Sequence, residues 1–184
     1  MYKRVIPFFL AILLVLVATI TAHANVTITI TPASGISGRP GETVGWGFYL
    51  TNDSLTDWVG FTNSLFFMNL PATWGTYTDL SNMHDPFAPG SDKVFVPFLI
   101  DQSGAGSFTI SKTATYNETS SGYIRFFYDI YNGDPTNGGT LLYSKSYDVV
   151  ASVSTPEPST YILLFLSLGV VGYARKKMKH QVET

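Results

Sequence analysis

The stretch Val26-Thr27-Ile28-Thr29-Ile30-Thr31 alternates one aliphatic residue with one threonine. In an extended chain, successive side chains point to opposite faces, so the aliphatic side chains lie on one face and the threonines on the other. The same period of two recurs at later apolar residues: Val44, Trp46, Phe48, Leu50, Phe108 and Ile110. The pattern predicts β-strands that turn one face toward a core and the other toward water.

Further segments outward from these strands are also typical of β-structure: residues 58–68, 93–100, 112–116, 123–131 and 141–150. Turns rich in Gly, Pro, Asn and Asp separate them, and no sustained helical period is present. About seven or eight short strands predict one all-β domain, an antiparallel β-sandwich of immunoglobulin-like architecture. A jelly roll or a small barrel is the alternative. The last two segments should form a closing hairpin around residues 132–139.

The composition limits the chemistry that this domain can perform. The chain has 184 residues, 13% of them charged, and no cysteine, which excludes disulfides, thiolate metal sites and cysteine nucleophiles. Residues 25–154 contain five Lys or Arg against eleven Asp or Glu, a net charge of -6, whereas the whole chain has -2. An acidic domain gives no case for nucleic-acid binding, because that binding needs a basic surface.

The N-terminal residues 1–24 have the pattern of a secretory signal peptide. Lys3 and Arg4 form a positive region, an apolar run covers residues 8–17, and Ala22 and Ala24 give the small-x-small pattern that signal peptidase reads. We therefore predict export and cleavage after Ala24. An uncleaved N-terminal anchor is the alternative.

Residues 155–184 have three parts. Pro156, Glu157 and Pro158 form an extended, exposed tripeptide, because proline on both sides disfavours helix. Residues 159–174 are uncharged and can form a short transmembrane helix. Four cations in residues 175–179 favour the cytoplasmic side and leave the tripeptide outside. The two ends of the chain therefore predict N-terminal export followed by a C-terminal membrane stop.

These three parts, in this order at the C-terminus, resemble the PEP-CTERM sorting signal of Gram-negative bacteria that make extracellular polysaccharide. The resemblance implies that exosortase, a membrane-embedded protease, recognises Pro156, Glu157 and Pro158 and removes the hydrophobic tail. It also implies that the protein is anchored transiently in the inner membrane and is then released or transferred to the cell surface. An ordinary tail anchor is the alternative. The resemblance covers the tail alone.

Residues 25–154 contain few side chains in a pattern suited to catalysis. Their single histidine, His84, has no histidine companion at metal-ligand spacing and is expected in a surface loop. Asp129, Asp134 and Asp148 could in principle form a glycosidase pair, but a turn position for Asp134 and an outward position for Asp148 are the better interpretations. We therefore predict no catalytic residues, no resident metal and no enzyme activity.

Weak calcium binding is the one cofactor that the sequence leaves open. Hard oxygen ligands for Ca²⁺ are plentiful, although their spacing fits no EF-hand. The candidate ligands are Asp53, Asp57, Asp79, Asp85, Asp92, Asp134 and Asn137.

Aromatic residues are the remaining candidates for function. Trp46 shares the period of Val44 and Phe48, so it is expected in the core. Trp58, Trp74, Tyr128 and Tyr131 are candidates for stacking against sugar rings. The leading hypothesis is a non-enzymatic surface or matrix protein associated with extracellular polysaccharide. The alternative is a carbohydrate-binding module that uses these aromatic residues.

Overall fold

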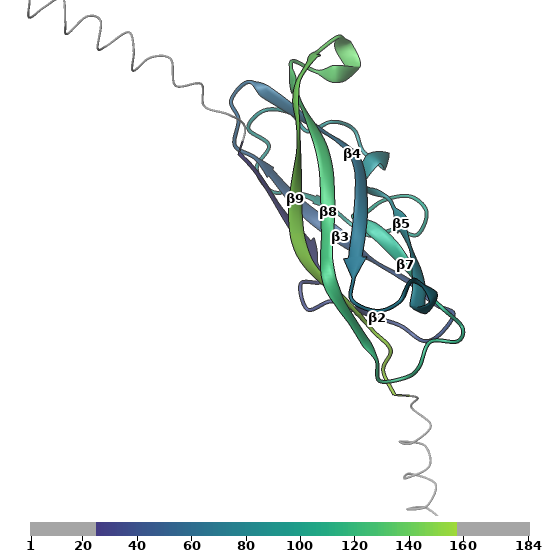
Figure 1. Cartoon of the computed structure of the whole chain (residues 1–184). Coiled ribbons are helices and arrows are strands. Elements are labelled where there is room, and N and C mark those ends of the chain that lie inside the picture. Colours follow the sequence, from purple (N-terminus) through teal and green to yellow (C-terminus); the bar gives the residue numbers. More distant parts are fainter. Residues whose placement is uncertain (1–24, 158–184) are drawn as a thin grey trace, which may run out of the picture.

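The computed structural model describes residues 25–157, and in that part of the chain nine strands form two sheets (Figure 1). The first sheet has the order β1 (Val26–Thr31), β3 (Thr43–Asn52), β7 (Gly106–Ile110) and β5 (Gly75–Asp79), and β6 (Val94–Val96) also pairs with β3. The second has the order β2 (Ile36–Ser37), β9 (Thr140–Ser154), β8 (Thr119–Asn132) and β4 (Asp57–Met68). The pairs are antiparallel apart from β2 with β9.

The core lies between the two sheets and is built from the alternating apolar residues of both. Phe48 of β3 and Phe126 of β8 are fully buried, with ring centroids 5.7 Å apart. Trp46 is also fully buried, as its period predicts. The expectation of an all-β domain is confirmed, because two sheets share one apolar core. The immunoglobulin-like assignment stays a prediction.

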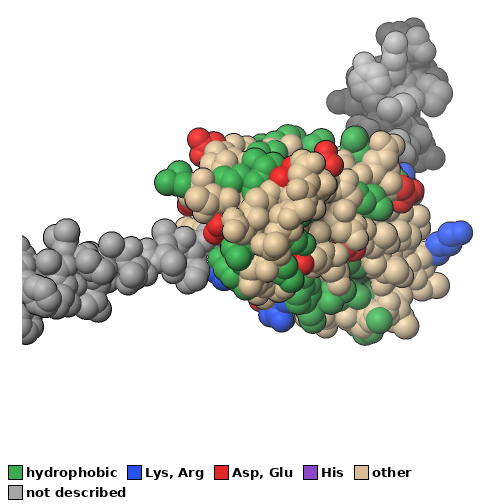
Figure 2. Space-filling view, turned by 90° about the horizontal axis from the view of Figure 1, so that it is seen from above, with side chains coloured by type: hydrophobic (Ala, Val, Ile, Leu, Met, Phe, Trp, Pro, Cys, Tyr) green, Lys and Arg blue, Asp and Glu red, His purple; other side chains and the backbone are tan. Residues whose placement is uncertain are grey.

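The hairpin of β8 and β9 spans the length of the domain. Its strands pair from Thr119 with Ser154 to Asn132 with Thr140, and the turn between them holds the short 3₁₀ helix η4 (Pro135–Asn137). In Figure 1 this tip lies at one end of the domain, and the chain leaves β9 at the other end. Figure 2, which looks onto the tip end, shows hydrophobic patches interspersed with acidic side chains.

The strand predictions are confirmed for the segments with clear alternation and wrong for two others. Residues 93–100 form a strand only at β6, and residues 112–116 form none. There, Ala114 N–H donates to the carbonyl of Ser111 at 3.0 Å, and the Ser111 and Thr113 hydroxyls bond each other at 2.8 Å. These local bonds favour a turn over a strand. The prediction also missed β5 and β2.

Residues 25–157 contain no helix with the length and apolar character needed to cross a membrane. The helices in this part of the chain are 3₁₀ turns of three residues: η2 (Ala72–Trp74), η3 (Ser81–Met83) and η4. The expected signal peptide, with Ala22 and Ala24, and the expected span at residues 159–174 lie outside the described residues, as does Pro158.

Candidate functional site

The chain stays attached to the domain for one residue beyond β9. Thr155 is 1% exposed, and its hydroxyl donates to the carbonyl of Thr115 at 2.6 Å. Two backbone bonds continue the pairing: Thr155 N–H donates to the Glu118 carbonyl at 3.0 Å, and Asn117 N–H donates to the Thr155 carbonyl at 2.7 Å. Glu118 N–H also donates to the Thr155 hydroxyl at 3.2 Å. We call residues 115–118 and 154–157 the sorting junction.

Asn117 has a left-handed backbone, with φ of 64°, which asparagine tolerates better than most residues. Its side-chain amide donates to Oε1 of Glu157 at 2.9 Å. Glu157 itself is exposed, as is Pro156 before it. The middle residue of the Pro-Glu-Pro tripeptide therefore has a defined partner on the folded domain.

Trp74 supports the sorting junction from the core side. Its indole N–H donates to Oε2 of Glu118 at 2.9 Å, and its ring packs against Phe108 with centroids 5.7 Å apart. The side chain is 6% exposed. Sequence reasoning placed Trp74 among the sugar-stacking candidates, but the structure places it in the core, where its ring is covered.

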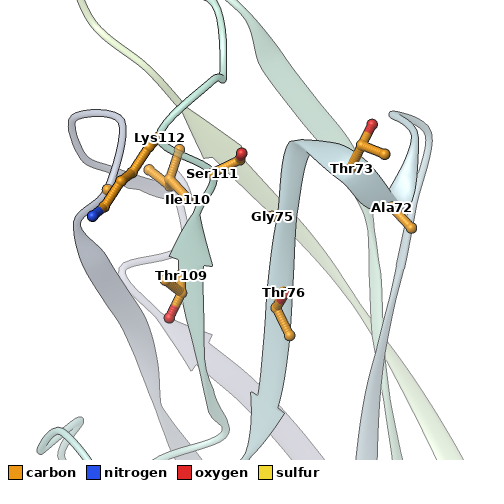
Figure 3. Close-up of a pocket in the computed structure, with 9 residues that line it drawn as sticks. Ala72, Thr73, Gly75, Thr76, Thr109, Ile110, Ser111 and Lys112 are labelled. Atoms are coloured by element: carbon orange, nitrogen blue, oxygen red, sulfur yellow. The ribbon is translucent and has the colours of Figure 1, made fainter.

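A cavity of about 370 Å³ lies where η2 and the ends of β5 and β7 meet (Figure 3). It is lined by hydroxyls and one cation, together with small residues and Ile110: Gly41, Ala72, Thr73, Gly75, Thr76, Thr109, Ile110, Ser111 and Lys112. This lining can form hydrogen bonds to polar groups, but it includes no carboxylate or imidazole for acid–base chemistry.

A second candidate surface is the side of the β4–β8–β9 sheet that faces away from the core, called here the outer face. On β8 it carries Tyr123, Arg125, Phe127, Asp129 and Tyr131, which alternate with residues that are mostly buried. Apolar side chains on the flanking strands extend it: Leu65 is 44% exposed, Phe67 40% and Val150 80%. The outer face is therefore rich in aromatic residues although it borders solvent.

At the tip end of the outer face, Trp58 on β4 lies directly opposite Tyr131 on β8. Both side chains are half-buried. A Cβ atom added to Gly60 would lie 3.3 Å from Cε2 of Tyr131, so the tyrosine ring lies over this glycine. The Tyr131 hydroxyl donates to Asp129 at 3.2 Å, and partial burial together with the Asp129 charge raises the pKa of Tyr131.

Toward the other end of the outer face, Phe67 and Tyr123 stack with centroids 5.0 Å apart and an interplanar angle of 18°. The Arg125 guanidinium lies over both rings, at 5.3 and 5.4 Å. It also donates twice to the Asp148 carboxylate, at 2.7 and 2.8 Å. The hydrogen bond from Arg125 lowers the pKa of Asp148.

Tyr128, the fourth aromatic candidate, faces the core. It is 4% exposed, and its ring makes an edge contact with Phe61 at 6.2 Å. Burial raises the pKa of its hydroxyl. Of the four predicted sugar-stacking residues, the structure therefore keeps Trp58 and Tyr131 together on the outer face and places Trp74 and Tyr128 inside.

His84 lies in the loop that follows η3, and its side chain is half-buried. Its ring lies edge-on to Phe48 at 5.8 Å, and its Nε2 accepts from Gly104 N–H at 3.4 Å. Burial lowers the pKa of His84, while the charge of Asp85 opposes that shift. The contacts are those of a packing residue, and within residues 25–157 no hydrogen bond joins the imidazole to a hydroxyl group.

The carboxylates considered for glycoside hydrolysis are held by other side chains. Asp134 accepts from Thr136 N–H at 2.9 Å and from Asn137 at 2.7 Å, as its turn position predicts, and these bonds lower its pKa. Asp129 accepts from Ser144. Asp148 lies opposite Arg125, four positions along β8 from Asp129. That offset is about 13 Å, beyond the separation used by glycosidases.

The calcium candidates do not converge in the described residues, where no three His, Cys, Asp or Glu side chains group together. Asp79 accepts from Ser81 N–H at 2.8 Å, and Asp57 accepts from the Thr56 hydroxyl at 2.8 Å. Both carboxylates therefore already have partners on their own loops. Calcium binding stays a prediction.

The comparisons with known proteins concern the tail. Residues 154–178 match the family model of the PEP-CTERM protein-sorting motif, and a search of curated proteins gave no match. The class is that of an exported protein, anchored transiently in a membrane and then processed by exosortase. In particular, this chain carries a PEP-CTERM sorting motif, as the order of its C-terminal parts predicts.

The match begins at Ser154, the last residue of β9, so the motif and the domain overlap at the sorting junction. Sequence reasoning identified the tripeptide but missed Asn117 and Thr155. The partners of these residues are about forty positions away in the chain, and no local pattern reports such contacts.

Proposed function

We propose that this protein is a non-enzymatic component of the cell surface or extracellular matrix that associates with extracellular polysaccharide. The main support for the proposal is the position of the sorting motif, which covers residues 154–178 at the end of the domain. The motif starts at the last residue of β9, and every residue of the apolar core precedes it. Removal of the tail beyond the tripeptide therefore leaves both sheets whole.

The contacts of the chemically capable side chains support a non-enzymatic role. The imidazole of His84 packs on Phe48, and Asp129 and Asp134 accept hydrogen bonds from neighbouring hydroxyl and amide groups. General acid–base catalysis needs such a group within reach of a reacting atom. These side chains are instead occupied in holding the domain together.

Replacement of Pro156, Glu157 and Pro158 by alanine tests the sorting step. In cells that contain exosortase, the variant should persist as a membrane-held precursor with the mass of an intact tail. The unchanged chain should lose that mass, and should keep it in cells that lack exosortase. Equal release of the variant and the unchanged chain would contradict the proposal.

A second candidate function is carbohydrate binding through the outer face. Tyr123, Phe127 and Tyr131 recur every fourth residue along β8, a spacing of about 13 Å. Arg125 and Asp129 lie between them and can form hydrogen bonds to sugar hydroxyls. Aromatic rings that border solvent beside polar groups are suited to stacking against sugar rings.

The charges on the outer face favour a neutral glycan over an anionic one. Arg125 is neutralised by its two bonds to Asp148, and Asp129 adds a negative charge on the same face. The domain as a whole is acidic, with five cations against eleven carboxylates in residues 25–154. Such a surface repels an anionic polymer at low salt.

Binding to immobilised neutral and acidic polysaccharides tests this second candidate. Tyr131→Ala should weaken retention on a neutral polysaccharide by about tenfold. Tyr49→Ala is the matched control, because Tyr49 stacks with Phe95 at 4.7 Å on the other sheet. Equal retention of both variants, or retention on acidic polysaccharides alone, would remove this candidate.

A further inference from the structure

The contact between Asn117 and Glu157 joins the folded domain to the residue at the centre of the sorting tripeptide. Asn117 Nδ2 donates to Oε1 of Glu157 at 2.9 Å across forty positions of sequence. Within residues 25–157, no hydrogen bond to Oε2 of the same carboxylate is present. One oxygen is therefore held by the domain, and the residue that carries it is exposed.

The fold sets the position of Glu157 through the two residues before it. Thr155 is buried and bonded on both its backbone and its hydroxyl, so the chain leaves the domain at a fixed point. Pro156 then restricts φ to about −65°, which limits where the next side chain can lie. Asn117 meets that side chain because its left-handed backbone turns the loop back toward β9.

We propose that Asn117 is a positioning residue for exosortase processing: it holds the Glu157 carboxylate in one orientation and presents its free oxygen to the protease. The inference rests on the sorting function but goes beyond it, because it assigns a role to a residue outside the matched motif. A flexible peptide loses conformational freedom when an enzyme binds it. A segment whose glutamate the domain already holds loses less.

Two variants of Asn117 separate positioning from a merely structural role. Asn117→Gly keeps the left-handed backbone without strain and removes the amide donor. Asn117→Gln keeps an amide donor but strains the backbone, because a longer side chain disfavours positive φ. If Asn117 has only a structural role, the glutamine variant should be processed more slowly than the glycine variant. If Asn117 positions Glu157, the glycine variant should be processed more slowly.

The experiment is a pulse-chase measurement of the full chain in cells that contain exosortase, with the half-time for conversion of precursor to mature protein as the readout. We expect Asn117→Gly to slow conversion by about threefold to tenfold and Asn117→Gln to remain closer to the unchanged chain. Asn117→Asp should be slowest, because its carboxylate repels Glu157.

Asn137→Asp is the matched control for charge. Asn137 donates to Asp134 at 2.7 Å at the hairpin tip, so this variant also places two carboxylates together, but far from the motif. It should be converted at the unchanged rate. A melting curve of each variant checks that the domain is folded.

The outcomes separate this inference from the sorting function. If the unchanged chain is converted and Asn117→Gly is converted equally fast or faster, the positioning role is wrong and the sorting function stands. A ranking with Asn117→Gln slowest also overturns the positioning role. If the unchanged chain is not converted at all, both proposals fall.

Discussion

The two ends of the domain use the same residue types in different ways. At the hairpin tip, Asn137 donates to Asp134 three positions away, and Trp58 lies half-buried on the outer face. At the sorting junction, Asn117 donates to Glu157 forty positions away, and Trp74 is buried. The turn at the tip is held by contacts within its own loop, whereas the junction is held by contacts between distant segments.

This difference shows where processing can be coupled to folding. A local contact such as that between Asn137 and Asp134 can form before the domain has folded, so its presence does not depend on the rest of the domain. The junction forms only when the loop at residues 115–118 lies beside the end of β9, which requires β8 and β9 to be paired as far as Thr119 and Ser154. The orientation of Glu157 is therefore a consequence of the completed fold.

The two tryptophans give the largest expected contrast. Trp74→Ala should lower the free energy of unfolding by about 3–5 kcal/mol, because it leaves a cavity against Phe108 and removes the donor to Glu118. Trp58→Ala should lower it by about 1–2 kcal/mol, because that side chain is only partly buried in the folded domain. Chemical denaturation of the exported form measures both values, and equal losses would contradict the assignment of the two rings.

Two threonines give the next largest contrast. Thr155→Val keeps the shape of a buried side chain but leaves the Thr115 carbonyl and the Glu118 N–H without their partner, a cost of about 1–3 kcal/mol. Thr136→Val removes an exposed bond to Asp134 at the tip and should change stability by less than about 0.5 kcal/mol. A Thr155→Val protein with an unchanged melting temperature would show that the junction is not held by this hydroxyl.

Between pH 8 and pH 5, we expect the free energy of unfolding to depend on the protonation of His84. Burial lowers the pKa of His84 in the folded state below its usual value near 6.5, so the unfolded chain binds the proton more readily. Stability from this group is complete above pH 6.5 and is lost as pH falls through 6.5 toward the lower folded-state pKa. Melting temperatures between pH 8 and pH 5 should show this decline. His84→Gln should not show it, and an increase in acid would contradict it.

The strands that the sequence predicts well are those whose two faces differ most. β1 alternates isoleucine or valine with threonine, and the burial of its side chains follows that alternation. β5 was missed because Gly75 and Thr76 give no apolar period, and Tyr77 is its one large apolar residue. Its place in the sheet depends on pairing with β7, a long-range contact that local pattern does not contain.

Among the candidate sites, those built from consecutive residues could be predicted from the sequence, and those built from long-range contacts could not. The tripeptide was predictable because its parts are consecutive in the chain, and so was the turn at Asp134. The burial of Trp74 was not predictable, because a tryptophan beside polar loops has no period that fixes its face. The role of Asn117 depends on a backbone conformation and a partner that exist only in the folded domain.

We expect the smallest change in stability from Gly60→Ala, which tests whether the outer face at the tip binds sugars. A Cβ at this position would lie 3.3 Å from the Tyr131 ring, so Gly60→Ala should tilt that ring away from the sheet. The ring borders solvent and can move, and alanine also reduces the freedom of the unfolded chain, so the net change should stay within about 0.5 kcal/mol. Retention on a neutral polysaccharide should nevertheless fall, because the tyrosine ring leaves its position over Gly60 on the outer face. Loss of stability together with unchanged retention would mean that Gly60 serves packing, and that the outer face at the tip is not a sugar-binding surface.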